Sequence, residues 1–255
     1  MHDPINCQKN HAPGETLDAL FDGRVELYQS RAGYRFSLDA VLLAHFVGIK
    51  ARDRIVDLGA GNGAIALMLG FLYPGARVVG IEIQAAMVER ARRSVALNGL
   101  AERVSMRRGD VRAPALLGAT ASFDIAVCNP PYRAPLSGRV SPNPEKRIAR
   151  HEFEGALAHF LHAGNVLLRS KGRLALVYPA FRCVDALASM RAAGIEPKRL
   201  RMVHSSHGAG ASLVLIEGIK GGKSEIAVEA PLFIYDQKRR YGAEVAAMLR
   251  SAPPR

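Results

Sequence analysis

The amino-acid sequence predicts an α/β protein built on a mostly parallel, doubly wound β-sheet. From residue 54 onward, short apolar runs alternate with segments whose apolar residues recur at helical spacing. A glycine-rich segment directly follows the first of these runs. Strands that alternate with helices form a parallel sheet covered on both faces, and such sheets bind ligands beyond the carboxyl ends of their strands. The residues that follow each predicted strand are therefore the candidates for function.

The composition is that of an ordinary globular protein. With 255 residues, of which 49% are hydrophobic, the chain can bury a large core. No run approaches the roughly 18 apolar residues of a membrane helix, and the amino terminus lacks the layout of an export signal. Cys7, Cys128 and Cys183 are isolated and odd in number, which argues against disulfides and a zinc site. We expect a cytoplasmic protein with no metal and no membrane partner.

The net charge is the first indication of a partner. The formal charge of +12 attracts polyanions and speeds their encounter with the protein. Nucleic acid is the polyanion that this charge favours. The alternative is a basic protein that has no polyanionic partner.

The amino-terminal part differs from the rest of the chain. Residues 1–15 are polar and without periodicity, which is typical of a loose tail. In the following unit, 16–47, apolar residues at 38, 41, 42 and 46 predict a helix, with Ser37 placed to cap it. We therefore divide the chain into a tail and small cap segment (1–47) and a main domain (48–255).

The main domain shows the alternation that defines the fold class. Strands are expected at 54–58, 78–83, 104–108, 124–128 and 173–177, and helices at 63–73, 84–98, 157–168 and 185–193. Gly99 stands just beyond the second of these helices, where a left-handed residue commonly ends a helix. The stretch 204–210 is expected to be a loop, and its His204 and His207 have no Cys or carboxylate companion at metal-ligand spacing.

A glycine loop follows the first strand and predicts a nucleoside-containing cofactor. The loop comprises Asp57, Gly59, Ala60, Gly61 and Gly63, and it opens a helix. Alternate glycines allow backbone angles closed to other residues and let a ligand approach the main chain. The free N–H groups of the helix start favour acceptor atoms.

Acidic residues end the next two strands. Glu82 comes about 20 residues after the glycine loop, where a carboxylate binds the hydroxyls of a ribose. Asp110, followed by Val111, ends the third strand and is placed to meet an adenine edge. This pattern also fits a nicotinamide dinucleotide. Asp57 favours S-adenosylmethionine, because a negative charge suits its sulfonium and ammonium groups and opposes a pyrophosphate.

The fourth strand ends in the most informative segment, Asn129-Pro130-Pro131-Tyr132. Two successive prolines make a rigid bend whose carbonyls are free to accept hydrogen bonds. The Asn129 side-chain oxygen and the Pro130 carbonyl can accept both hydrogens of one amino group, and Tyr132 offers a face for a planar base. Such acceptors localise the lone pair of a conjugated amine and aim it at a methyl group, which predicts catalysis by orientation and electrostatics.

Together these segments resemble a known enzyme family. The loop 57–63, Glu82, Asp110 and the Asn-Pro-Pro-Tyr segment resemble the amino-nitrogen class of Rossmann-like methyltransferases. Within it, the chain is similar to bacterial adenine-N6 methyltransferases of valine tRNA, from about residue 27 to 217 and including 34–44. The resemblance implies a seven-stranded sheet with an antiparallel last strand, which 213–216 would join. It also implies that Ser37 and Asp39 lie near the methionine end of the cofactor.

The segment after the tetrapeptide points to the substrate. Arg133, Arg139, Lys146, Arg147 and Arg150 form a basic loop beside the predicted chemistry. Such a loop suits a phosphate backbone and an unpaired or flipped base, so we expect RNA, as tRNA, to be the partner. The alternative is a solvated surface loop. This stretch, and the tail beyond 221 with Lys238-Arg239-Arg240, depart from the tRNA enzymes.

Other functions stay open at this stage. The same tetrapeptide serves enzymes that methylate a glutamine amide of release factors, so protein glutamine-N5 and small-molecule methyltransferases are alternatives. An oxidoreductase that uses a nicotinamide dinucleotide and a non-catalytic RNA-binding module are two further classes. The sequence does not specify the oligomeric state.

Overall fold

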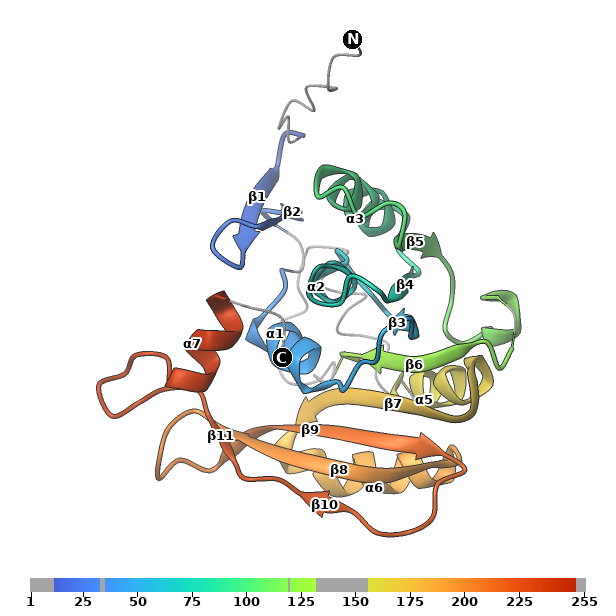
Figure 1. Cartoon of the computed structure of the whole chain (residues 1–255), viewed down its shortest axis with the longest axis vertical. Coiled ribbons are helices and arrows are strands. Elements are labelled where there is room, and N and C mark those ends of the chain that lie inside the picture. The colour runs from blue at the N-terminus through green and yellow to red at the C-terminus, as the bar shows by residue number, and fades with distance from the viewer. Residues whose placement is uncertain (1–11, 33–34, 119, 132–155, 251–255) are drawn as a thin grey trace.

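A nine-stranded, mostly parallel sheet forms the centre of the computed structural model, which describes residues 12–32, 35–118, 120–131 and 156–250. Its strands run in the order β10-β8-β9-β7-β6-β3-β4-β5, and β11 also pairs with β8 (Figure 1). The antiparallel pairings are those of β9 with its neighbours β7 and β8. The strands are β3 (Arg54–Leu58), β4 (Arg77–Glu82), β5 (Val104–Arg108), β6 (Phe123–Cys128), β7 (Leu168–Pro179), β8 (Ile195–His204), β9 (Ala211–Lys220), β10 (Ala227–Val228) and β11 (Leu232–Phe233).

Helices cover both faces of this sheet. Along β6, Ile125 and Val127 pack into one core cluster, whereas Ala126 and Cys128 pack into the other, as the two-residue period of a strand requires. Within the described ranges, no helix has the length and apolar character needed to cross a bilayer. One face carries α1 (Leu38–Phe46), α2 (Ala64–Leu72), α3 (Ala85–Leu97) and α7 (Ala243–Arg250), and the other carries α5 (Ala156–Leu167) and α6 (Cys183–Ala192) (Figure 1).

The predicted fold class is confirmed. The strands expected at 54–58 and 104–108 coincide with β3 and β5, and 213–216 lies in the antiparallel strand β9. The expected number of seven strands is that of β3 to β9, and the short strands β10 and β11, which pair in parallel with β8, raise it to nine. Strand β7 is longer than the expected 173–177, because its first part is polar and exposed at Arg169, Ser170 and Lys171 and carries no apolar pattern.

The predicted helices also appear, with ends shifted by one or two residues. Gly99 follows α3 with a φ of 63°, the left-handed conformation expected there. Ser37 occupies the N-cap position of α1, but its side chain makes no capping hydrogen bond, so that part of the expectation is wrong. Helix α1 packs in the same core cluster as α2. The division of the chain between residues 47 and 48 stays a prediction.

An amino-terminal hairpin was not predicted. Strand β1 (Glu15–Leu20) pairs with β2 (Val25–Ser30) in a separate antiparallel sheet beside α3 (Figure 1). The Tyr28 N–H donates to the Ser94 hydroxyl at 2.9 Å, and the Glu26 N–H donates to the Asn98 side chain at 2.9 Å. Backbone N–H groups of β2 therefore bind side chains of α3, and this contact between distant segments leaves no motif in the sequence.

The carboxyl-terminal part adds structure that the sequence did not reveal. Strand β8 carries alternating basic and apolar residues, and the short strands β10 and β11 extend the sheet along its outer edge. Helix α7 then folds back, and Val245 reaches the core cluster next to α1. The stretch after Gly221 is therefore an integral part of the fold.

Candidate functional site

The register of the sheet brings four strand ends to one edge. Leu58 of β3 pairs with Ile81 of β4 on one side and with Cys128 of β6 on the other. Glu82 of β4 pairs in turn with Arg108 of β5. The glycine loop, Glu82, Asp110 and Asn129 therefore follow adjacent parallel strands at the same level. Parallel sheets bind ligands at such an edge.

The three glycines of the loop all adopt left-handed backbone angles, but for different reasons. Gly59, Gly61 and Gly63 have φ values of 69°, 57° and 81°. A Cβ at Gly59 would lie 2.7 Å from the Phe160 ring, and one at Gly63 would lie 3.0 Å from the Ala91 Cβ. A Cβ at Gly61 would meet no atom of the described residues within 4 Å. Two glycines therefore let the loop pack, and Gly61 leaves open space above the backbone.

Glu82 holds the loop from the neighbouring strand. Its carboxylate is buried and accepts 2.9 Å hydrogen bonds from the N–H of Gly61 and from the N–H of Gln84. The Ala60 N–H donates to the Ile81 carbonyl at 2.9 Å, which fixes the loop against β4. A carboxylate oxygen has two lone pairs, so a carboxylate that receives backbone N–H groups is also of the chemical type that accepts ribose hydroxyls.

Asp57, near the end of β3 and just before the loop, is a buried acid. The residue is 1% exposed, and neither carboxylate oxygen makes a hydrogen bond within the described part of the chain. Burial raises the pKa of Asp57 to about 7, and the neighbouring charge of Glu82 adds to the rise. The Ala66 amide offsets part of this shift without completing a hydrogen bond. Such a group favours a positively charged ligand.

Asp110 is placed at the predicted strand end, but its carboxylate already has a partner. The Arg112 guanidinium donates to both oxygens at 2.7–3.0 Å, and the Arg112 N–H donates at 2.9 Å. The Arg112 hydrogen bond therefore lowers the pKa of Asp110. Val111 is half-buried against the second core cluster. A contact of Asp110 with an adenine edge stays a prediction, and it would have to share the carboxylate with Arg112.

The predicted catalytic turn begins where β6 ends. Asn129 and Pro131 are partly buried, and Pro130 is buried. The register places Asn129 level with Gly59, on the neighbouring strand. Tyr132 lies outside the described residues, as does the predicted substrate loop with Arg133, Arg139, Lys146, Arg147 and Arg150. The roles assigned to them remain predictions.

Sequence reasoning missed the support that the loop receives from the hairpin. The Asn62 side chain is 2% exposed and donates to Gln29 Oε1 of β2 at 2.7 Å. The same oxygen accepts the Phe36 N–H at 2.9 Å, and the Gln29 amide donates to Asp18 of β1. Phe160 of α5 was also missed as the ring that packs on Gly59. No motif marked these residues, because each contact joins segments distant in the chain.

The three residues Cys128, His204 and His207 show no sign of nucleophilic or metal-binding chemistry within the described part of the chain. Cys128 is fully buried, and burial raises the pKa of its thiol above the ordinary range. His204 contacts the Ala209 carbonyl through Nδ1 at 2.7 Å, and His207 stacks on Phe233. The described residues contain no group of three His, Cys, Asp or Glu side chains arranged to hold a metal ion.

Comparison with known proteins identifies the family. Residues 38–192 match the sequence profile described as "Methyltransferase small domain". A tRNA1(Val) (adenine(37)-N6)-methyltransferase of Dickeya chrysanthemi is 30% identical over 95% of this chain and 96% of its own length. The enzyme of the same name from Porphyromonas gingivalis is 35% identical over 63% of this chain, but the match spans 64% of its own length, which is less than two thirds.

A solved structure shares the fold. The crystal structure of a predicted O-methyltransferase, Atu636 from Agrobacterium tumefaciens, superposes with a TM-score of 0.70 at 24% identity. The superposition covers 84% of this chain and 97% of that one. The fold, the strand-end arrangement and the sequence match agree, and the chain therefore belongs to the methyltransferase small-domain family.

Proposed function

We propose that this protein transfers a methyl group from S-adenosylmethionine to N6 of an adenine in tRNA. The observation that carries the proposal is the position of Asn129-Pro130-Pro131, one strand away from the glycine loop at the same edge of the sheet. The names of the Dickeya and Porphyromonas relatives support the substrate class. A tRNA substrate also agrees with the cytoplasmic location expected from the sequence.

The residues at the edge fit S-adenosylmethionine. The open space over Gly61 admits a ligand to the backbone, and Glu82 can accept the hydroxyls of a ribose. Asp57 supplies a buried carboxylate that makes no hydrogen bond with the residues that the structure describes. A pyrophosphate would gain nothing from that acid, whereas the ammonium and sulfonium groups of S-adenosylmethionine are stabilised by it. This charge argument disfavours a nicotinamide dinucleotide.

Catalysis would rest on acceptors and not on a strong base. S-adenosylmethionine supplies the methyl group on an electrophilic sulfonium. The Asn129 side-chain oxygen and the Pro130 carbonyl would accept the two hydrogens of the exocyclic amine. Holding those hydrogens out of the ring plane localises the nitrogen lone pair and orients it for attack. Tyr132 would stack on the adenine, a contact worth about 1–3 kcal/mol.

The test is transfer of a labelled methyl group to separated fractions. The protein is incubated with methyl-labelled S-adenosylmethionine and with either total tRNA, release-factor protein or a small-molecule extract. The tRNA is then digested to nucleosides. We expect label in N6-methyladenosine. Label only in a glutamine of the protein fraction would establish a protein amide methyltransferase instead. Label only in the extract would establish a small-molecule methyltransferase.

A further inference from the structure

A second surface at the same edge of the sheet combines exposed aromatic rings with basic side chains. Strand β11 runs parallel to β8, with Phe233 paired to His204 at the carboxyl end of that strand. Because β8 is antiparallel to β9 and β9 is antiparallel to β7, this end of β8 lies at the edge where β7 and β6 also end. Four strand spacings separate β11 from β6, or about 19 Å.

A tight turn projects from this point between β11 and α7. Tyr235 and Tyr241 form an isolated antiparallel bridge, and the Asp236 N–H donates to the Arg240 carbonyl at 2.8 Å. The Asp236 carboxylate accepts the N–H groups of Lys238 and Arg240 at 2.8 and 2.9 Å. Hydrogen bonds among the residues of the turn therefore stabilise its backbone conformation.

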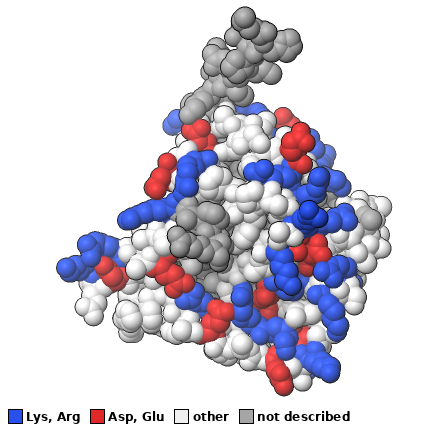
Figure 2. All heavy atoms as spheres, viewed as in Figure 1, with Lys and Arg blue, Asp and Glu red and all other residues white. Residues whose placement is uncertain are grey.

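The turn presents aromatic and basic groups to solvent. The Tyr235 and Tyr241 rings stack with centroids 5.4 Å apart, and they are 38% and 45% exposed. Lys238 and Arg239 are exposed and make no ion pair within the described part of the chain, while Arg240 pairs with Asp236. Basic side chains mark the same tip in the space-filling view (Figure 2). Aromatic rings beside basic side chains are the combination on which bases stack while phosphates are bound.

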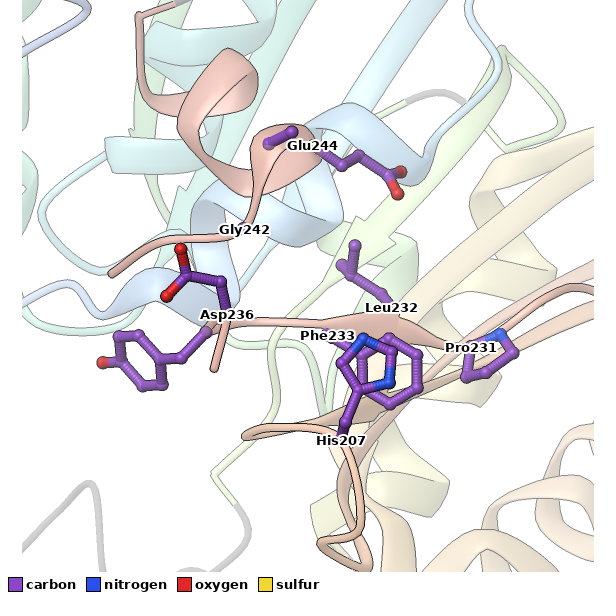
Figure 3. Close-up of a pocket in the computed structure, with 9 residues that line it drawn as sticks. His207, Pro231, Leu232, Phe233, Asp236, Gly242 and Glu244 are labelled. Carbon is purple, nitrogen blue, oxygen red and sulfur yellow. The ribbon is translucent and has the colours of Figure 1, made fainter. Parts of the chain in front are cut away.

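A pocket of about 290 Å³ lies beside the turn. One wall is the His207 ring stacked on the Phe233 ring, with centroids 3.8 Å apart, and Leu232 lies next to it (Figure 3). The Glu244 carboxylate at the rim is paired with Arg201 at 2.5 and 2.8 Å. The volume is just below the roughly 300 Å³ at which ligand pockets begin.

We propose that the turn 235–241 and the adjoining pocket form a second RNA-binding surface that anchors the substrate away from the catalytic turn. The phosphates contact Lys238 and Arg239, and unpaired bases stack on Tyr241 or enter the pocket. Stacking on aromatic rings combined with basic groups is the chemistry that recognises single-stranded RNA. The separation of about 19 Å from β6 is short enough for one folded RNA to reach both places. The inference rests on the proposed function.

The test compares two charge-matched double variants of the full chain. Lys238→Ala with Arg239→Ala removes two positive charges from the turn. Arg77→Ala with Lys223→Ala removes one Lys and one Arg from the opposite edge of the sheet, where β4 begins and β9 has ended. We expect the first pair to raise the KM for tRNA about tenfold and to flatten the salt dependence of tRNA binding. The second pair should stay near wild type, and neither should change kcat or the Kd for S-adenosylmethionine.

A third variant separates stacking from charge. Tyr241→Leu keeps an apolar side chain of similar bulk but lacks an aromatic ring, so it should weaken retention of tRNA on a filter while leaving retention on heparin unchanged. If the Lys238/Arg239 double variant binds tRNA as tightly as the Arg77/Lys223 control, the proposed surface is wrong, even if the wild-type enzyme methylates tRNA. A wild-type protein that methylates no RNA overturns the proposed function instead, and filter binding of tRNA then decides the surface.

Discussion

The Asn62 side chain in the glycine loop donates a 2.7 Å hydrogen bond to Gln29 Oε1 on the amino-terminal hairpin. Both residues are nearly fully buried, at 2% and 1% exposure. The Gln29 side-chain amide in turn donates a hydrogen bond to Asp18. The Asp18 carboxylate also accepts a hydrogen bond from Arg35, just before α1. The loop is thus supported from a segment far from it in the sequence, and its geometry depends on the hairpin.

Replacing Gln29 should therefore affect the cofactor site. Gln29→Ala leaves the Asn62 amide and the Phe36 N–H without their acceptor, at a cost of about 1–3 kcal/mol in the free energy of unfolding. The glycine loop loses a fixed position, so the Kd for S-adenosylmethionine should rise several-fold in calorimetry. Asn98→Ala is the matched control, since it breaks the contacts of Glu26 with α3 and leaves the loop untouched. Asn98→Ala should lower the free energy of unfolding and leave the Kd for S-adenosylmethionine unchanged. Equal Kd values for Gln29→Ala and Asn98→Ala would show that the hairpin does not position the glycine loop.

This relationship shows what the sequence was able to predict. Asp57 and Glu82 lie at the carboxyl ends of β3 and β4, and Asn129 follows β6, so the rule that parallel strands end at one edge suffices to bring them together. No sequence pattern identifies Gln29, because it meets Asn62 only once the hairpin has packed against α3. Local patterns identify residues that follow strands. They do not identify residues that pack across distant segments.

The pH dependence of cofactor binding should follow from Asp57. Its pKa of about 7 lies above the ordinary 3.8, so the ligand-free protein is stabilised by this group below pH about 4 and loses that contribution as pH rises to about 7. A cationic ligand favours the carboxylate. Binding should therefore release a proton below pH 7, and affinity should increase with pH up to about that value.

The measurement is calorimetric titration with S-adenosylmethionine below and above pH 7, in buffers of different ionisation enthalpy. Asp57→Asn should abolish the pH dependence and the proton release. It should also raise the Tm of the ligand-free protein above pH 7, because the cost of ionising a buried acid is removed. A wild-type affinity that does not change between the two pH values would show that Asp57 does not face the cofactor charge.

Two glycines of the loop should respond differently to alanine. Both substitutions place a side chain at a left-handed φ, at a cost of about 1–2 kcal/mol. Gly59→Ala also drives a methyl group into the Phe160 ring, adding about 1–3 kcal/mol of overpacking. Gly61→Ala meets open space and should mainly weaken cofactor binding. Thermal unfolding and Kd together distinguish the two, and a larger loss of Tm in Gly61→Ala than in Gly59→Ala would refute this division of roles.

The glycine pair also marks a limit of sequence reasoning. The spacing of Gly59, Gly61 and Gly63 predicted a ligand loop, and all three have the left-handed angles that such a loop needs. The spacing did not tell which glycine serves packing and which serves the ligand. That distinction depends on Phe160 and Ala91, whose positions are set by α5 and α3.

Replacing Glu82 should weaken the binding of S-adenosylmethionine more than it slows methyl transfer. Glu82→Gln places an N–H₂ group where one oxygen now accepts a backbone N–H, so one of the bonds to Gly61 or Gln84 is lost. We expect the Kd for S-adenosylmethionine to rise about tenfold or more, which corresponds to ~1.4 kcal/mol. Glu89→Gln on the exposed face of α3 is the control, with its carboxylate 67% exposed. A Kd within error of the control would remove Glu82 from the cofactor site.

Asn129 should show the opposite pattern. Asn129→Ala removes the side-chain oxygen proposed to hold the substrate amine, while the backbone that follows β6 keeps its place through Pro130 and Pro131. We expect the rate of methyl transfer to fall by about 10²–10³ or more, since removal of one oriented polar group from a transition-state site costs this much. The Kd for S-adenosylmethionine should stay near wild type. The two quantities are measured by single-turnover transfer to tRNA and by calorimetry. A variant that transfers methyl at the wild-type rate would show that the amine is activated elsewhere.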